Sequence, residues 1–231
     1  MSIYAIWGAP QTGKTTLAVN LAYALSRGDQ SVCLISPVVY SELSAFLGVK
    51  IPEENSLNTA LRGAPLRQTV FKADELLYVL AAPSAASALD SDYSGEQVRT
   101  LLELARLTFD VVLVDCLSET NDLFSAWALS RADKVLLCAG GHVSGVLWHR
   151  ANKKALQAAQ GKTLYVGAEV IPGLDYAAMY KLLKCTPEIK IPYVREAPLF
   201  QNERRFLFGL SGKRGRAYAK AINKLYEAVS L

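Results

Sequence analysis

The chain has few of the residues that build metal centres and disulfide frameworks. It holds 4 cysteines and 2 histidines in 231 residues. The four cysteines, Cys33, Cys116, Cys138 and Cys185, form no C-x-x-C pair, and the first three lie in or beside apolar runs typical of strands. His142 and His149 are flanked by no acidic cluster. We therefore expect buried, reduced thiols and structural or surface histidines, without a disulfide or a metal site.

Long apolar runs are also missing. No run approaches the roughly 20 residues that a membrane-spanning helix requires. Residues 3–7 are already typical of a strand, which leaves no room for the charged and apolar regions of a signal peptide. The composition is 51% hydrophobic and 20% charged, as in ordinary globular proteins. These features predict a cytoplasmic protein with a single domain over residues 1–231.

Apolar runs alternate with helical patterns along the chain. Buried strands are predicted at 3–7, 31–36, 76–82, 109–115, 134–139, 163–170 and 189–193, with a further short apolar pair at 70–71. Helices are predicted at 15–27, 41–47, 94–107, 123–130, 146–160, 176–184 and 217–229, while residues 84–93 are small, polar and irregular. This alternation predicts an α/β fold with a mostly parallel, twisted sheet of about seven strands and helices on both faces.

A phosphate-binding loop lies between the first strand and the first helix. Residues 8–15 fit the pattern G-x-x-x-x-G-K-[ST]. The predicted nucleotide-binding residues are Gly8, Ala9, Pro10, Gln11, Thr12, Gly13, Lys14, Thr15 and Thr16. The glycines let the backbone N–H groups turn inward, and the helix N-terminus adds its positive dipole end. We expect Lys14 to reach the β- and γ-phosphates, where it also acts electrostatically in catalysis, and Thr15 to ligate Mg²⁺.

Asp115 is the predicted second half of the magnesium site. It ends the run Val111-Val112-Leu113-Val114, whose lack of alternation is typical of a parallel strand covered on both faces. At the carboxyl end of a strand beside the first, its carboxylate would hold Mg²⁺ through water. An aspartate that merely starts a turn is the plainer alternative.

Several segments together resemble the ParA/MinD group of P-loop ATPases over nearly the whole chain. They are the loop at 8–15 and the segments T-L-A-V-N-L-A-Y-A-L (16–25), S-V-C-L-I (31–35), F-D-V-V-L-V-D-C (109–116) and A-D-K-V-L-L-C (132–138). Within the group, the general resemblance is greatest to CpaE/TadZ-type proteins that position pilus-assembly machinery. The resemblance implies ATP or ADP with Mg²⁺, a homodimer and a protein partner in pilus or secretion machinery.

The departures from the group concern hydrolysis. The lysine that reaches across the dimer is replaced by Ala9, and the Asp-x-Asp after the second strand is replaced by Ser36 and Val38. Ser118 stands where a proline usually follows the strand-ending aspartate. The Asn that often contacts adenine in the group would fall near residues 168–169, which here are Ala and Glu. The 191–193 segment resembles the adenine-side loop, which makes Pro192 a candidate base contact.

The sequence therefore predicts a protein that binds ATP and Mg²⁺ but hydrolyses ATP slowly or not at all. There is no convincing general base, because valine cannot orient or deprotonate water; Glu42 or Asp122 could substitute from a loop. The alternative is an active ATPase that partitions plasmids or chromosomes and binds DNA nonspecifically. A small-molecule kinase or ligase is less favoured, since no arginine-rich lid is found.

The C-terminal region is basic. Residues 181–224 carry eleven basic side chains against three acidic ones, which could neutralise DNA phosphates or be an ordinary solvated surface. The last helix has a small apolar face without Phe or Trp, so packing on the sheet is favoured over peripheral membrane contact. Phe206 and Phe208 are expected to be core anchors rather than an exposed docking loop.

Overall fold

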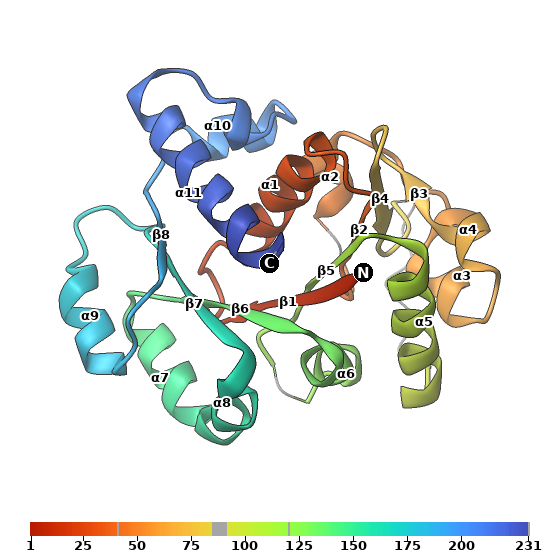
Figure 1. Cartoon of the computed structure of the whole chain (residues 1–231), viewed down its shortest axis with the longest axis horizontal. Helices are drawn as coiled ribbons and strands as arrows, with labels where there is room; N and C mark the ends of the chain where they lie inside the picture. The colour runs from red at the N-terminus through yellow and green to blue at the C-terminus, as the bar shows by residue number, and fades with distance from the viewer. Residues whose placement is uncertain (41, 85–91, 120, 231) are drawn as a thin grey trace.

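The computed structural model describes residues 1–40, 42–84, 92–119 and 121–230. Within them, one eight-stranded sheet has the order β3-β4-β2-β5-β1-β6-β7-β8 (Figure 1). The strands are β1 (Ser2–Gly8), β2 (Val32–Ile35), β3 (Phe71–Lys72), β4 (Leu77–Leu80), β5 (Val111–Asp115), β6 (Lys134–Ala139), β7 (Thr163–Ala168) and β8 (Ile189–Ile191). All pairings are parallel except that of β3 with β4.

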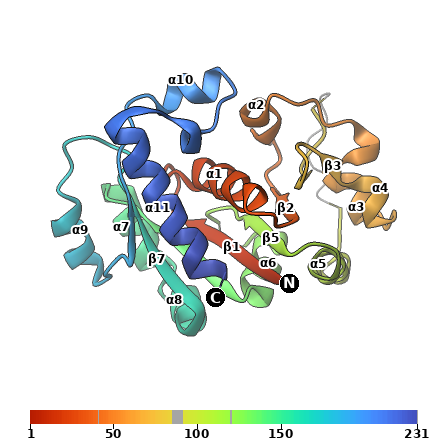
Figure 2. The ribbon, with the colours of Figure 1, turned by 45° about the horizontal axis from the view of Figure 1, so that its top comes forward.

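Helices cover both faces of the sheet. They are α1 (Lys14–Arg27), α2 (Leu43–Leu47), α3 (Leu57–Leu61), α4 (Leu66–Thr69), α5 (Gly95–Thr108), α6 (Leu123–Arg131), α7 (Val143–Ala151), α8 (Lys153–Ala159), α9 (Tyr176–Leu183), α10 (Ala197–Asn202) and α11 (Gly212–Ser230). Short 3₁₀ turns are η1 (Glu53–Asn55), η2 (Gln160–Lys162) and η3 (Leu207–Gly209). Helices α1 and α11 lie on one face, and α6 and α8 lie on the other (Figure 2).

The alternation of side chains along the strands divides the core into two layers. In β1, Tyr4 and Ile6 pack under α1 and α11, whereas Ile3, Ala5 and Trp7 pack against α5, α6 and α8. This is the period-two pattern of a sheet that is buried on both faces. Because the central strands are parallel, the loops after β1, β2, β5 and β6 all emerge at one edge of the sheet.

The predicted fold class is confirmed, and some of the predicted elements differ. The sheet has eight strands rather than about seven, because residues 71–72 form the antiparallel edge strand β3. The helix predicted at 146–160 is two helices, α7 and α8, divided at Asn152, whose side-chain amide donates to the Trp148 carbonyl at 2.9 Å. The short helix predicted at 41–47 is α2 (Leu43–Leu47), and residue 41 lies outside the described residues. Most of the irregular segment 84–93 also lies outside them.

The last helix begins earlier than predicted. It starts at Gly212 rather than near residue 217, although Gly212 and Gly215 disfavour a helix. Gly215 is buried, and a Cβ there would lie 1.7 Å from the Leu210 carbonyl oxygen, so glycine allows the close approach of η3. The expected apolar face of α11 packs in the core through Tyr218, Ile222 and Leu225. No helix in the described part of the chain is both long and apolar enough to cross a membrane.

Candidate functional site

The backbone of the loop after β1 requires glycine at two positions. Gly8 has φ 150°, and a Cβ there would lie 2.5 Å from the Cys138 carbonyl oxygen on β6. Gly13 has φ 76° and precedes α1, whose first turn has no acidic residue and no side-chain cap. The N–H groups at this helix end are therefore available to an anion, while Pro10 and Gln11 form the exposed tip of the loop. Thr12, fully buried, donates its hydroxyl to the Ala9 carbonyl at 2.9 Å.

Lys14 lies folded back across the loop. Its ammonium group donates to the Ala9 carbonyl oxygen at 3.0 Å and to the Ser118 hydroxyl at 2.8 Å. Burial lowers the pKa of Lys14, and the nearby Cys138, Asp115 and Glu119 oppose that shift. A desolvated cation held by two neutral oxygens is poorly compensated, so an anionic group entering the loop would be strongly attracted to it.

Thr15 and Asp115 meet as the sequence predicts. Strand β5 is the parallel neighbour of β1, with Asp115 in register with Ile6. The Thr15 hydroxyl donates to Asp115 Oδ2 at 2.7 Å. Asp115 is only 2% exposed, and desolvation raises its pKa to about 6, although the Thr15 hydrogen bond and the Lys14 charge act in the opposite direction. A buried carboxylate and a hydroxyl are the hard oxygen ligands that Mg²⁺ prefers, so this pair fits a magnesium ion.

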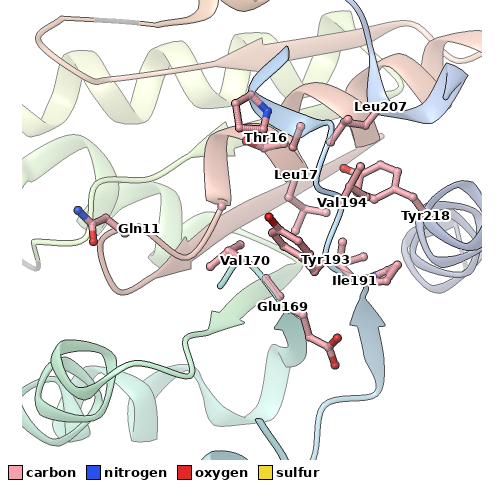
Figure 3. A pocket seen from close by; sticks show the side chains of 15 residues that line it. Gln11, Thr16, Leu17, Glu169, Val170, Ile191, Tyr193, Val194, Leu207 and Tyr218 are labelled. Carbon is pink, nitrogen blue, oxygen red and sulfur yellow. The ribbon is translucent and has the colours of Figure 1, made fainter. Parts of the chain in front are cut away.

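A cavity of about 330 Å³ adjoins the loop. Gln11, Gly13 and Thr16 of the loop and of α1 line it, as does Pro192 after β8; Figure 3 labels Gln11 and Thr16 among the lining side chains. Its apolar and aromatic walls consist of Leu17, Ala168, Val170, Ile191, Tyr193, Val194, Ala197, Pro198, Leu207 and Tyr218, with Glu169 at the margin. The cavity thus has the size and largely apolar character of a small-molecule site and lies directly beside the phosphate loop.

Part of that cavity comes from a segment that the sequence patterns did not predict to be structured. Helix α10 and η3 supply Ala197, Pro198 and Leu207, and contacts with α1 fix their place. The Phe206 ring stacks on Tyr23 with centroids 3.9 Å apart, and the Phe208 N–H donates to Asn20 Oδ1 at 3.0 Å. Phe206 and Phe208 therefore pack against the core, as expected. The R-R-F-L-F-G run at residues 204–209 marks this segment in the sequence, but only its tertiary contacts show that it helps to form the cavity.

Candidate positions for a water-activating acid follow β2 and β5. Ser36 is buried and Val38 is half-buried, immediately after β2 at the edge where the loop lies. Asp122 caps α6, because its Oδ2 accepts the Ser125 N–H at 2.6 Å. Glu42 is exposed, although its charge helps to raise the pKa of Asp115. The Asp122 carboxylate is thus engaged in capping α6, whereas the Glu42 side chain makes no capping bond to α2.

The structure also places the other residues at which the sequence departs from the ParA/MinD pattern. Ala9 is 1% exposed, so the position of the missing lysine faces the interior in this conformation. Glu169 is half-buried, and its N–H donates to the Ile191 carbonyl at 3.0 Å, which joins β7 to the start of the 191–193 segment. The four cysteines are all buried, and the two ring nitrogens of His142 are buried without a hydrogen-bond partner in the described structure.

Comparisons with known proteins agree with this architecture. No protein-family model matches the chain. The septum site-determining protein MinD of Bacillus subtilis (strain 168) is 26% identical over 144 residues, which is 60% of this chain and 53% of that protein. The match therefore spans about half the length of that relative.

Solved structures match over the whole chain. MinD of Pyrococcus horikoshii OT3, complexed with Mg-ADP, has a TM-score of 0.76 and 17% identity, covering 99% of this chain and 98% of that one. A ParA family ATPase from Chlorobium tepidum TLS has a TM-score of 0.78 and 15% identity, covering 100% of both chains. The chain has the P-loop NTPase fold of MinD and ParA proteins. The narrower resemblance to CpaE/TadZ-type proteins stays a prediction.

Proposed function

We propose that this protein binds ATP·Mg²⁺ in the loop and cavity described above and hydrolyses it slowly or not at all. The observation that carries this proposal is the Thr15–Asp115 hydrogen bond of 2.7 Å beside the poorly compensated Lys14. The hydroxyl comes from the first turn of α1 and the carboxylate from the end of β5, and they meet at one partly buried spot. Both groups are oxygen ligands of the kind that suits a divalent cation.

Each residue has a role in this proposal. The N–H groups of the loop and of the first turn of α1, apart from Pro10 which has none, bind phosphate oxygens, and Lys14 leaves Ala9 and Ser118 to bind the β- and γ-phosphates. Thr15 ligates Mg²⁺ directly, and Asp115 holds it through water. Bound there, Mg²⁺ would neutralise phosphate charge. Pro192 and the apolar walls of the 330 Å³ cavity hold the base.

The side chains around the phosphate loop support slow hydrolysis. Val38 offers no acceptor for a water proton, and Asp122 is held by the Ser125 N–H at 2.6 Å. Ala9 supplies no cation to a partner subunit. Of the two carboxylates that could replace the missing acid, Glu42 makes no helix-capping bond with its side chain, and it lies exposed on the loop after β2.

We further propose that the protein acts as a nucleotide-dependent positioning or assembly factor for pilus or secretion machinery and forms a homodimer. This proposal rests on the sequence resemblance to CpaE/TadZ-type proteins. Large apolar side chains around the mouth of the loop support self-association. Tyr40 is 79% exposed after β2, Leu123 is 40% exposed after β5, and Val143 is 75% exposed after β6.

Calorimetry and turnover measurements test the central proposal. Titrating the protein with ATPγS and ADP, each with and without Mg²⁺, should give binding that Mg²⁺ strengthens. Lys14→Ala should abolish binding, whereas Lys153→Ala, an exposed lysine on α8, should not. Turnover of ATP comparable to that of active ATPases of this fold would overturn slow hydrolysis, and absence of any nucleotide binding would overturn the whole proposal.

A second candidate function is DNA binding, as in an ATPase that partitions DNA. All eleven basic side chains between residues 181 and 224 are exposed, and ion pairs within the described residues engage only Arg205 and Arg214. Lys190, Lys220 and Lys224 line one cleft of about 350 Å³ between β8 and α11. A triple charge reversal at these lysines should lower both DNA affinity and its salt dependence. Unchanged binding, or none in the parent protein, would reject this candidate.

A further inference from the structure

Tyr218 lines the cavity beside the phosphate loop, and its hydroxyl has no hydrogen-bond partner among the described residues. The residue is only 3% exposed. Figure 3 shows its ring reaching from α11 toward α1, where Leu17 borders the same space. Desolvation raises the pKa of Tyr218, so the hydroxyl is neutral and can both donate and accept a hydrogen bond.

The fold does not need this hydroxyl. Buried tyrosine hydroxyls usually find a partner, and one that stays unpaired costs free energy. Most other residues of the cavity wall are apolar, among them Leu17, Val194 and Leu207. Phenylalanine in place of Tyr218 would fill the same space without an unpaired polar atom. A buried hydroxyl at the wall of a cavity is therefore suited to a ligand that enters the cavity.

The other polar side chains of the cavity wall are less suited to contact a ligand deep inside it. Thr16 and the loop side chains lie on the side where phosphates would bind. Desolvation and, after it, the charge of Glu169 raise the pKa of Tyr180 on α9, which places the Glu169 carboxylate toward that helix. Figure 3 likewise shows the Glu169 side chain extending away from Thr16. Tyr193 is 38% exposed, so Tyr218 is the buried hydroxyl that faces the cavity.

We propose that the Tyr218 hydroxyl forms a hydrogen bond with the six-membered ring of the purine base of a bound nucleotide. This inference rests on the proposed nucleotide binding. Figure 3 shows Gln11 of the phosphate loop and Tyr218 at opposite ends of the lining side chains. A purine is joined to its ribose through the five-membered ring, so a nucleotide with its phosphates on the loop extends the six-membered ring toward Tyr218. That ring of adenine carries an acceptor nitrogen, N1, and a donor amino group, and the hydroxyl can pair with either.

Calorimetry with ADP·Mg²⁺ and inorganic pyrophosphate·Mg²⁺ gives the first test, because pyrophosphate carries the phosphates of ADP without the base. Tyr218→Phe should lower the affinity for ADP about three- to tenfold, the value of one neutral hydrogen bond, and leave pyrophosphate binding unchanged. Tyr180→Phe is the matched control. Tyr180 is 4% exposed, its hydroxyl is also buried without a partner in the described structure, and it lies outside the cavity. The control should change neither affinity.

Base analogues distinguish a hydrogen bond from a change in packing. The ring nitrogen N1 is missing from 1-deaza-ADP, and the amino group is missing from purine riboside diphosphate. Both groups are kept in 7-deaza-ADP, which is altered only in the five-membered ring. Tyr218→Phe should weaken the binding of one of the first two analogues much less than it weakens ADP, and should weaken 7-deaza-ADP as much as ADP. Equal losses for ADP and all three analogues would overturn the inference, because the hydroxyl would then act only through packing.

Thermal unfolding of the empty protein completes the test. Tyr218→Phe should leave the unfolding midpoint unchanged or raise it, and a fall would contradict the inference, because the hydroxyl would then have a partner within the fold. If the parent protein binds neither ADP nor pyrophosphate, the proposed function fails, and this inference fails with it. If the parent binds ADP and Tyr218→Phe binds it equally well, only the inference fails, and the proposed nucleotide binding stands.

Discussion

Thr15 and Asp115 share a hydrogen bond of 2.7 Å although they are 100 residues apart in the chain. The bond exists because α1 starts directly above the end of β1, and β5 is the parallel neighbour that ends beside it. The pair buries a carboxylate whose pKa is raised to about 6. Such an arrangement costs stability in the empty protein and is suited to a cation, which is typical of functional sites.

The first prediction concerns the stability cost of Asp115. The pKa is about 3.8 for the unfolded group and about 6 in the folded protein, so the native state binds the proton more tightly. Ionisation therefore destabilises the fold progressively as the pH rises from about 4 to 6, and the cost stays constant above that range. Without nucleotide and Mg²⁺, Asp115→Asn should raise the free energy of unfolding at pH 7.5 by about 1–3 kcal/mol.

Denaturant unfolding at several pH values measures this effect. The difference between the variant and the parent should vanish near pH 4, where both states carry the proton. Asp133→Asn, which changes a half-exposed carboxylate far from the loop, serves as a comparison and should not reproduce this pH profile. A stability loss in Asp115→Asn at pH 7.5 would contradict the prediction. With nucleotide present, the variant should lose the strengthening of binding by Mg²⁺.

The second prediction concerns the loop backbone. Gly8→Ala places a Cβ 2.5 Å from the Cys138 carbonyl oxygen, a contact with backbone that cannot move without shifting β6. We expect a loss of about 1–3 kcal/mol in the free energy of unfolding together with weaker nucleotide binding. Gly161→Ala, where a Cβ meets nothing within 4 Å, should be close to neutral. Equal effects in the two variants would show that the loop tolerates a different backbone.

The third prediction concerns the cavity beside the loop. Ala197→Trp on α10 should fill part of the 330 Å³ space and lower the affinity for ADP about tenfold or more, while inorganic triphosphate still binds. Gln201→Trp adds the same side chain at an exposed position of the same helix and is the matched control. Equal loss of ADP and triphosphate binding in Ala197→Trp would mean that the cavity does not hold the base.

The parts of the site that follow from local patterns could be predicted from the sequence. Residues 8–15 carry their own backbone requirements, and Asp115 ends an apolar run whose parallel neighbours the alternation implies. The bond from Lys14 to Ser118 could not be predicted, because it joins residues 104 positions apart and Ser118 stands where related sequences have a proline, which offers no hydroxyl. Likewise, the base-side wall depends on Phe206 stacking on Tyr23, a contact that no periodicity encodes.

Differences in the fold have the same origin. Where α7 divides from α8, the side-chain amide of Asn152 and its own backbone N–H both donate to the Trp148 carbonyl, a local contact that a helical apolar pattern does not register. The early start of α11 depends on Gly215 packing against Leu210, where the composition favours a loop. In each case a single side chain or its absence overrides the propensity of the segment.

The last prediction concerns hydrolysis. Val38 is half-buried after β2, at the edge where the phosphate loop lies, and the sequence resemblance to ParA/MinD ATPases predicts that it replaces their water-positioning acid. If the missing carboxylate is what limits turnover, Val38→Asp should raise the ATPase rate about tenfold or more, since a positioned base typically contributes at least that much. Val39→Asp places the same charge on the neighbouring residue, which is 42% exposed, and should leave the rate unchanged. An unchanged rate in Val38→Asp, with nucleotide binding intact, would mean that Ala9 or the Ser118 loop restricts hydrolysis instead.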